Sequence, residues 1–366
     1  MLIFKIMVPS QQGGLDEQLN SLSVQLVDML KNEKLTLTQL LVTRIYLSDT
    51  ANQLEVLHQH PLWLQLKAGA VSFIEQPLLS GEKVALHCVL TTELNVEKVG
   101  TPERMKMGIG ALKILFQSVR FTAAEAKSLS AEEETIETFR RHQQFLKEEG
   151  LTLEANCHRT WFYVRDVDRN YQGVVVGRNK VFAKEGLTGD THYIASTGIG
   201  GYPSNAESIV CADFLSVDGL QRNDVRYLQA LKYLNPTREY GVAFERATSL
   251  DANGQRYLML SGTASIDNQG KVLYERDVQA QTERLFLNIE KLLNDGEASL
   301  SNLEYAIVYL RDISDYPVVA AYLKKRLHHL PVLIVEARVC RPGWLIEVEG
   351  IARLAQIGRA SCRERV

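Results

Sequence analysis

The sequence repeats itself, and this repeat limits the folds that the chain can adopt. Residues 36–49, TLTQLLVTRIYLSD, align without gaps on residues 299–312, SLSNLEYAIVYLRD. Each copy follows an amphipathic, helix-like stretch, at residues 15–30 and 277–293. The identical positions are Leu37 and Leu300, Leu40 and Leu303, Tyr46 and Tyr309, Leu47 and Leu310, and Asp49 and Asp312. We therefore expect one helix, loop and strand arrangement to occur at least twice.

A third copy lies in the middle of the chain, where the helix-like FRRHQQFLKEEGLT leads into CHRTWFYVRD. It places Gly150, Tyr163, Arg165 and Asp166 on Gly296, Tyr309, Arg311 and Asp312. Chance similarity between amphipathic helices and Val/Ile-rich strands is the alternative, but the matches join helix and strand in the same order. The sequence therefore predicts an α+β fold of tandem units, each with a mixed sheet and helices packed on one face.

We place the predicted units at residues 1–98, 99–218 and 219–356. The first unit is degenerate. Only the third has a complete N-terminal part, because its residues 240–266 read as two strands around a turn at Asn253-Gly254. The last ten residues, 357–366, read IGRASCRERV and look like a translated sequencing adapter. We exclude this tail from fold reasoning.

Length and composition narrow the class of protein. A chain of 366 residues exceeds what one compact core usually holds. With 45% hydrophobic and 23% charged residues it has an ordinary globular composition, and no apolar run is long enough for a membrane span. The net charge of −3 and the lack of a basic stripe argue against nucleic-acid binding. The N-terminus is a poor signal peptide, so we expect a cytoplasmic protein with no membrane partner.

The cysteines give no sign of a disulfide framework or a metal site. Cys88, Cys157, Cys211 and Cys340 are far apart, without a C-x-x-C pair or a histidine at ligand spacing. The two G-x-G segments lack the strand and helix of a dinucleotide-binding fingerprint. We therefore expect neither a metal nor another cofactor.

Motifs in the predicted third unit follow a known order. The hairpin leads to SGTASI, then a helix with Gln281 and Asn288, then VYLRD, EARVC and IEVEGIA. This order resembles the Rid family (YjgF-type reactive-intermediate deaminases), in which EARVC is similar to the motif P-A-R-x-C. The resemblance implies small α+β units arranged as a trimer, with active sites where adjacent units meet.

The resemblance is closer to the chorismatases, which are built on Rid-like domains and hydrolyse chorismate. The similar stretches are Phe244–Ala247, Ser261–Ile266, Gln281–Ile289, Tyr309–Asp312, Cys340–Arg341 and Glu347, and, in the middle unit, RTWFYVRD and STGIGG. The middle unit is thus similar to a chorismatase N-terminal part. Three departures put the substrate in doubt. Phe244 and Arg246 stand where the deaminases have Tyr and Gln, and Asp267-Asn268 stands where the chorismatases have Gly-His. Arg338 stands where chorismatases tend to have an acidic residue and deaminases have their carboxylate-binding arginine.

The residues of the third unit suggest an acid and an anion-binding group on one surface. Arg338 and Cys340 lie two apart in one predicted strand, and Glu347 and Glu349 do likewise in the next. If these strands pair across a turn at Pro342-Gly343, an arginine, a thiol and a carboxyl group converge. Arginine is a natural partner for a substrate carboxylate, and a carboxyl group sheltered by apolar neighbours acquires a raised pKa that suits proton transfer.

We therefore predict Glu347 and Cys340 as catalytic residues. The predicted substrate-binding residues are Arg338, Arg311, Tyr240, Arg246, Ser261 and Gly262. For Arg338 and Glu347 the structural alternative is a cross-strand salt bridge, and for Arg311 it is a solvated charge at the end of a strand. For Cys340 the alternative is a small buried side chain.

Three functions remain open on these residues. The first is a cofactor-independent, chorismatase-like hydrolase that releases pyruvate from a small carboxylate substrate such as chorismate. The second is a Rid-type 2-imino acid deaminase, and the third is a non-catalytic ligand-binding protein on the same scaffold. Because the chain holds three related units, we expect a monomer that acts as a pseudo-trimer, without an obligate partner.

Overall fold

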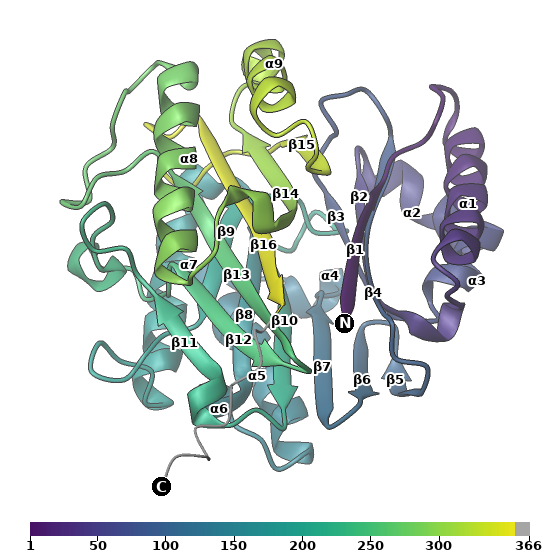
Figure 1. The fold of residues 1–366 in the computed structure, drawn as a ribbon, viewed down its shortest axis with the longest axis horizontal. Coiled ribbons are helices and arrows are strands. Elements are labelled where there is room, and N and C mark those ends of the chain that lie inside the picture. The colour runs from purple at the N-terminus through teal and green to yellow at the C-terminus, as the bar shows by residue number, and fades with distance from the viewer. Residues whose placement is uncertain (356–366) are drawn as a thin grey trace, which may run out of the picture.

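The computed structural model describes residues 1–355, apart from the side chain of Tyr240. In this part of the chain the strands form three sheets (Figure 1). The first sheet has the order β1-β4-β2-β3, with β1 (Leu2–Met7), β2 (Leu40–Leu47), β3 (Ala70–Glu75) and β4 (Val84–Thr91). The second has the order β5-β6-β7-β10-β8-β9, with β5 (Val96–Thr101), β6 (Arg104–Ile109), β7 (Leu112–Val119), β8 (Cys157–Val164), β9 (Ala195–Gly200) and β10 (Val210–Asp218). The third has the order β11-β12-β13-β16-β14-β15, with β11 (Val225–Leu228), β12 (Ala247–Ala252), β13 (Gln255–Ala264), β14 (Leu303–Leu310), β15 (Val332–Glu336) and β16 (Ile346–Ala355).

The three sheets share one topology, so the prediction of tandem α+β units with mixed sheets is confirmed. The second and third sheets have the same strand order, and the first corresponds to their last four strands. In each sheet one parallel pair, β2–β3, β8–β9 or β14–β15, lies among antiparallel pairs. The helices that connect these parallel pairs are α2 (Thr50–Gln59) with α3 (Pro61–Leu66), α7 (Val167–Lys184) and α9 (Tyr316–Arg326).

Strand register reproduces the alignment of the repeats. Tyr46, Tyr163 and Tyr309 occupy equivalent places on β2, β8 and β14, and each is fully buried. Their antiparallel partners are Ala85, Cys211 and Glu347, respectively. A position in one unit can therefore be compared directly with its counterparts in the other two.

A long amphipathic helix covers the outer face of each sheet. These helices are α1 (Leu15–Asn32), α5 (Ala131–Glu148) and α8 (Val278–Asp295), and Figure 1 shows α1 and α8 on the outside of their sheets. Ser130 caps α5 and Asp277 caps α8 by accepting from backbone N–H groups of the first turn. Shorter elements are α4 (Ala123–Ala126), α6 (Leu153–Asn156) and the 3-10 turns η1 (Leu37–Gln39), η2 (Arg222–Asp224), η3 (Thr237–Tyr240), η4 (Leu300–Asn302) and η5 (Ile313–Asp315).

The units close into a ring within one chain. Strand β3 lies against β7, β9 lies against β13, and β1 lies against β14. Backbone bridges join Glu75 to Tyr202, Ile199 to Val339 and Leu78 to Val335. Each unit therefore contacts the other two, as in a pseudo-trimer.

Two expectations about strands need correction. The N-terminal part of the middle unit is also complete, because β5 and β6 form an antiparallel hairpin. The predicted division at 98/99 falls inside β5. The segments around Arg338 and Glu347 do not pair across a turn at Pro342-Gly343, because β14 lies between β15 and β16. The parallel crossover through α9 places β15 at the sheet edge. The other predicted unit boundaries stay predictions.

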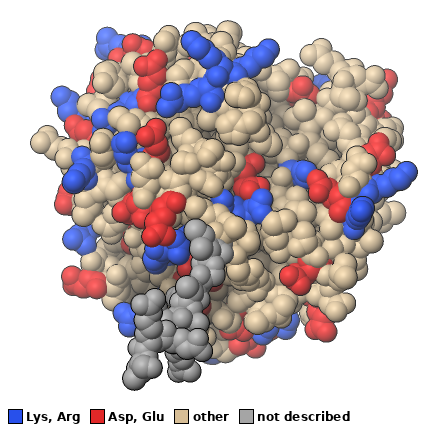
Figure 2. All heavy atoms as spheres, in the orientation of Figure 1, with Lys and Arg blue, Asp and Glu red and all other residues tan. Residues whose placement is uncertain are grey.

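Residues 357–366, the predicted adapter-derived tail, lie outside the described residues. None of the helices in residues 1–355 has the length and apolar character needed to cross a membrane. On the face shown in Figure 2, Lys and Arg side chains are interspersed with Asp and Glu side chains.

Candidate active site

A cavity of about 40 Å³ lies where the second and third units meet, and we call it the interface cavity. One wall comes from α7 and β9 of the second unit, and the other from the third unit. The side chains that bear chemistry in its lining are those of Tyr171, Arg178, Ser196, Arg246, Cys340, Arg341 and Glu347. Four residues predicted for the site, Glu347, Cys340, Arg246 and Gly262, are thus brought together around one space.

Hydrogen bonds between β9 and the third unit fix the two walls. The Ser196 N–H donates to Ser261 Oγ at 2.8 Å, and this hydroxyl donates to the Glu245 carbonyl at 2.5 Å. The Gly262 N–H donates to Thr197 Oγ1 at 3.0 Å. Ser261 is buried and is not part of the lining. It therefore fastens the walls together, whereas Gly262 belongs to the wall itself.

Glycine is required at two places in the lining. A Cβ atom added to Gly262 would stand 1.9 Å from Glu347 Oε1, so the carboxyl group lies directly on this backbone. A Cβ atom added to Gly198 on β9 would stand 2.6 Å from the Tyr171 ring. Both close approaches explain why the sequence has glycine in SGTASI and in STGIGG.

Glu347 is the acid of the cavity. It lies on β16, is 4% exposed, and pairs in register with Ala264 and Tyr309. Burial and then the charge of Glu349 raise its pKa to about 8, and Arg159 and Arg246 oppose this shift. The side chain is therefore protonated at neutral pH, which is the state that a general acid needs.

Cys340 lies beside Glu347 with a protonated thiol. Burial, followed by the neighbouring Glu347, raises the pKa of Cys340 to about 12. Its thiol also forms a hydrogen bond with the Tyr171 side chain. Because the thiolate is the nucleophilic form, the Cys340 thiol is suited to hydrogen bonding and packing and not to covalent attack.

Two buried arginines supply positive charge to the cavity. Arg246 is 5% exposed, and its Nη2 donates to the backbone and side-chain oxygens of Asn235, both at 3.1 Å. Arg178 on α7 is 1% exposed, and its Nε and Nη2 atoms have no hydrogen-bond partner among the described residues. The Phe244 ring lies 5.4 Å from Arg246 Cζ and 5.9 Å from Arg178 Cζ. A buried guanidinium with unused donors is an open binding group for an anion.

Arg338 and Arg311 do not line the cavity. Both pair with Asp168 on α7: Arg311 makes two contacts at 2.5 and 3.0 Å, and Arg338 makes one at 3.2 Å. Arg311 also donates to the Val339 carbonyl at 2.7 Å. The Arg338 side chain is 65% exposed, so this group ties the two units together at the surface. The predicted convergence of Arg338 with Glu347 was wrong because it assumed that their strands pair. The side chain of Tyr240 lies outside what the structure describes.

Arg178 and Tyr171 were missed by sequence reasoning because they come from another unit. A signal for Arg178 was present, since it lies on the apolar face of a helix, between Val174 and Val181. An arginine in such a position is buried and needs a partner. Arg341 belonged to the Cys340–Arg341 motif, and its guanidinium lies 4.8 Å from the Trp344 ring.

The Gln281 and Asn288 motif holds the cavity in shape from behind. The two side chains lie seven residues apart on α8 and so share one helix face. Gln281 donates to the Gly343 carbonyl at 2.8 Å and accepts from the Leu345 N–H at 2.9 Å. Asn288 donates to the carbonyls of Ala264 and Ile266 at 3.1 and 2.9 Å. These residues position the wall segments and have no contact with the cavity.

Comparisons with known proteins agree with the Rid-like fold of the third unit. The sequence profile described as Endoribonuclease L-PSP matches residues 247–354. The 3-aminoacrylate deaminase RutC of Acinetobacter baylyi is 27% identical over 97 residues, which are 26% of this chain and 77% of that protein. A RutC family protein of Pyrococcus abyssi is 30% identical over 60 residues, which are 16% of this chain and 47% of that protein.

One solved structure matches the whole ring. The crystal structure of a chorismatase superposes with a TM-score of 0.67 and 16% identity, over 96% of this chain and 98% of that one. Within residues 1–355 no group of three His, Cys, Asp or Glu side chains is placed to hold a metal ion. Residues 247–354 of this chain are therefore similar to the Endoribonuclease L-PSP family, and the described chain as a whole has the fold of the chorismatase structure.

Proposed function

We propose that this protein is a cofactor-independent hydrolase that releases pyruvate from a small carboxylate substrate such as chorismate. The observation that carries this proposal is the pairing, in one cavity, of a carboxyl group with a pKa of about 8 and a buried arginine with unused donors. The first can supply a proton at neutral pH, and the second can bind a carboxylate. The likeness to a chorismatase supports the same reaction class at the level of the fold.

The proposed reaction begins with proton transfer from Glu347. The double-bond electrons of the enolpyruvyl group take this proton at the methylene carbon and leave an oxocarbenium ion at the adjacent carbon. A water molecule adds to that carbon and returns a proton to the Glu347 carboxylate. The resulting hemiketal breaks its bond to the ring oxygen, which takes the hydroxyl proton. One water is consumed, and pyruvate and a ring alcohol are formed.

Arg178 and Arg246 are assigned to the substrate carboxylates. A second cavity of about 40 Å³ adjoins the first and shares Phe244 and Arg246 with it. Chorismate is larger than either space, so its binding requires the Phe244 and Arg246 side chains to move and join the two. The Glu347 carboxyl group, held on Gly262, then faces the reacting end of the substrate.

Imine deamination is the alternative that a specific observation favours. The third unit is similar to a 3-aminoacrylate deaminase over most of that protein's length. Against it, Arg338, at the position of the deaminase carboxylate-binding arginine, pairs with Asp168 outside the interface cavity. A ligand-binding protein without catalysis is the third possibility.

Purified protein incubated with chorismate, with pyruvate measured by a coupled dehydrogenase, tests the proposal directly. We expect pyruvate from the wild type and none from Glu347→Gln. Ammonia release from 2-iminobutanoate without pyruvate release would replace the proposal by the deaminase alternative. Saturable chorismate binding with neither product would indicate a binding protein.

A further inference from the structure

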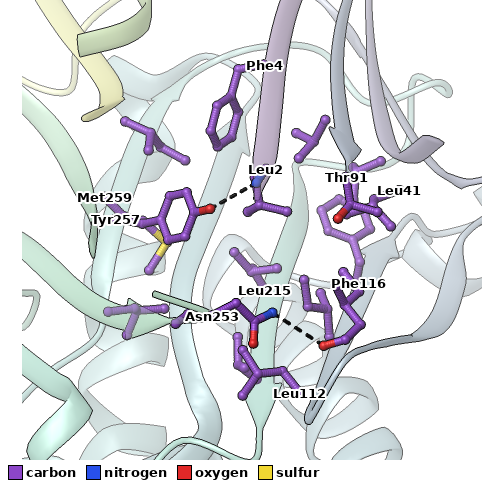
Figure 3. A pocket seen from close by; sticks show the side chains of 18 of the residues that line it. Leu2, Phe4, Leu41, Thr91, Leu112, Phe116, Leu215, Asn253, Tyr257 and Met259 are labelled. Atoms are coloured by element: carbon purple, nitrogen blue, oxygen red, sulfur yellow. Dashed lines mark hydrogen bonds between the residues drawn. The ribbon is translucent and has the colours of Figure 1, made fainter. Parts of the chain in front are cut away.

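A further cavity, of about 110 Å³, lies at the centre of the ring, and we call it the axial cavity. All three units contribute to its lining, and none of its residues lines the interface cavity. Figure 3 shows Phe4, Leu41, Phe116, Leu215 and Met259, carried by strands of different units, around one space. Its walls are therefore almost wholly apolar.

Two buried polar side chains that carry nitrogen atoms without a hydrogen-bond partner among the described residues also line the axial cavity. Arg44 and His87 are register partners on β2 and β4, and they are 4% and 3% exposed. Arg44 Nη1 makes no hydrogen bond, and both ring nitrogens of His87 lack a partner among the described residues. The ring of Trp161 lies 3.5 Å from Arg44 Cζ and covers one face of the guanidinium.

The charges around Arg44 do not balance. Arg44 lies 3.5 Å from a Glu349 oxygen and 3.8 Å from an Asp213 oxygen. Each of these carboxylates already has its own arginine: Arg159 at 2.7 Å from Glu349 and Arg120 at 3.0 Å from Asp213. The described network thus holds three arginines against two carboxylates. A buried cation in excess is costly unless an anion joins it.

We propose that the axial cavity binds a small apolar carboxylate. The carboxylate group accepts hydrogen bonds from Arg44 and His87, and the hydrocarbon part lies among the apolar walls. An apolar cavity of about 150 Å³ accommodates benzene, so the smaller axial cavity of about 110 Å³ suits a carboxylate with no more heavy atoms than benzene, such as butanoate. The proposal does not depend on the activity assigned to the interface cavity.

Calorimetry and thermal unfolding of the full chain, with butanoate and 1-butanol as matched probes, test this site. We expect saturable binding of butanoate at about one per chain, at least about tenfold tighter than 1-butanol, because a charge-assisted hydrogen bond is lost with the alcohol. Arg44→Met should abolish this preference. Leu112→Trp, at a half-buried position in the lining, should block both probes while leaving any activity at the interface cavity unchanged.

The site can be tested even if Arg44→Met does not fold. Loss of butanoate binding in Leu112→Trp, together with butanoate density beside Arg44 in a crystal, supports the site. Equal affinity for acid and alcohol, or undiminished binding in folded Leu112→Trp, overturns it. Density for ordered water alone at saturating butanoate also overturns it.

Discussion

Glu347 and Glu349 lie two residues apart on β16 and face different surroundings. Glu349 accepts hydrogen bonds from Arg159 and Trp161 at 2.7 and 3.0 Å and is also hydrogen-bonded to Thr197. The Glu347 carboxyl group lies against the Gly262 backbone in the interface cavity, and the pKa of Glu347 is raised to about 8. Glu349 is the charged neighbour that helps to keep Glu347 protonated.

The raised pKa predicts how Glu347→Gln changes stability with pH. The folded state holds the Glu347 proton up to a pH of about 8, whereas an unfolded chain loses it above about 4.5. The contribution of this residue to the free energy of unfolding is therefore highest below pH 4.5 and falls as the pH rises to about 8. Since Gln cannot ionise, the free energy of unfolding of the variant should rise relative to that of the wild type over this window, by an amount on the order of 5 kcal/mol at most.

Urea unfolding at pH 5, 7 and 9 measures this difference. Glu336→Gln, on an exposed side chain of β15, is the control and should show no such trend. A constant difference between Glu347→Gln and the wild type would mean that Glu347 ionises normally in the folded protein.

The same group sets the expected pH dependence of activity. If Glu347 donates the proton, kcat/KM for chorismate should be constant at low pH and fall about tenfold per pH unit above a pH of about 8. Pyruvate release measured from pH 6 to 10 gives this profile. Activity that rises across pH 8 would assign Glu347 as a base instead.

Arg178 is expected to bind substrate, and Arg338 is not. Arg178→Met should raise KM for a carboxylate substrate at least about tenfold, through loss of a charge-assisted hydrogen bond. It should not lower the free energy of unfolding, because it removes a buried charge whose Nε and Nη2 have no hydrogen-bond partner. Arg338→Met, whose side chain is 65% exposed, is the matched control and should change KM less than twofold. Steady-state kinetics and urea unfolding on both variants check this. A larger change in KM for Arg338→Met than for Arg178→Met would show that Arg338 belongs to the substrate-binding site.

The sequence analysis named four of the residues that the third unit contributes to the interface cavity. Glu347, Cys340, Arg246 and Gly262 all come from motifs of the third unit. Arg178 and Tyr171 could not be assigned in this way, because their place depends on how α7 of another unit packs against β9 and β13. Arg338 was misplaced for a related reason: a short segment between two strands does not reveal that another strand separates them.

At the scale of elements, α8 determines the position of two wall segments. Its polar residues Gln281 and Asn288 lie on a buried face among leucines and bond to backbone groups at the end of β13 and in the loops beside the cavity. Burial of an amide on an apolar helix face is tolerated because each of these side chains forms hydrogen bonds with backbone groups.

Asn288→Leu should therefore destabilise the protein. The carbonyls of Ala264 and Ile266 would lose their donors, at a cost of about 1–3 kcal/mol for each buried group. The exposed Gln279→Leu on the same helix is the control and should change the free energy of unfolding by less than about 0.5 kcal/mol. Equal effects in urea unfolding would show that the Asn288 hydrogen bonds contribute nothing to stability.

Helix periodicity and the repeat gave the order of the elements, including α1 and α8 to within a few residues. The hairpin of β5 and β6 was missed because VEKVGT has little apolar alternation to mark a strand. The pairing error at β15 and β16 arose because the parallel crossover is a property of the sheet and not of either segment.

At the scale of the whole molecule, the equivalent interfaces have diverged. Glu347 on β16 corresponds to Cys211 on β10 and Ala85 on β4. Between the first and second units Arg120 binds Ser72 and the Phe73 carbonyl at 3.0 and 2.9 Å, and pairs with Asp213. An acid at this register therefore remains only between the second and third units, among the described residues.

This divergence predicts a monomer with one active site per chain. A homotrimer of identical subunits needs a complete interface three times, whereas here β3–β7, β9–β13 and β1–β14 close the ring inside a single chain and only one carries Glu347 at this register. Light scattering should give about one chain mass, 41.2 kDa, over a range of protein concentrations. Titration with a tight substrate analogue should give one interface-cavity site per chain. An obligate trimer, with each site formed by third units of different chains, would contradict the prediction, because it would require the ring contacts within the chain to open.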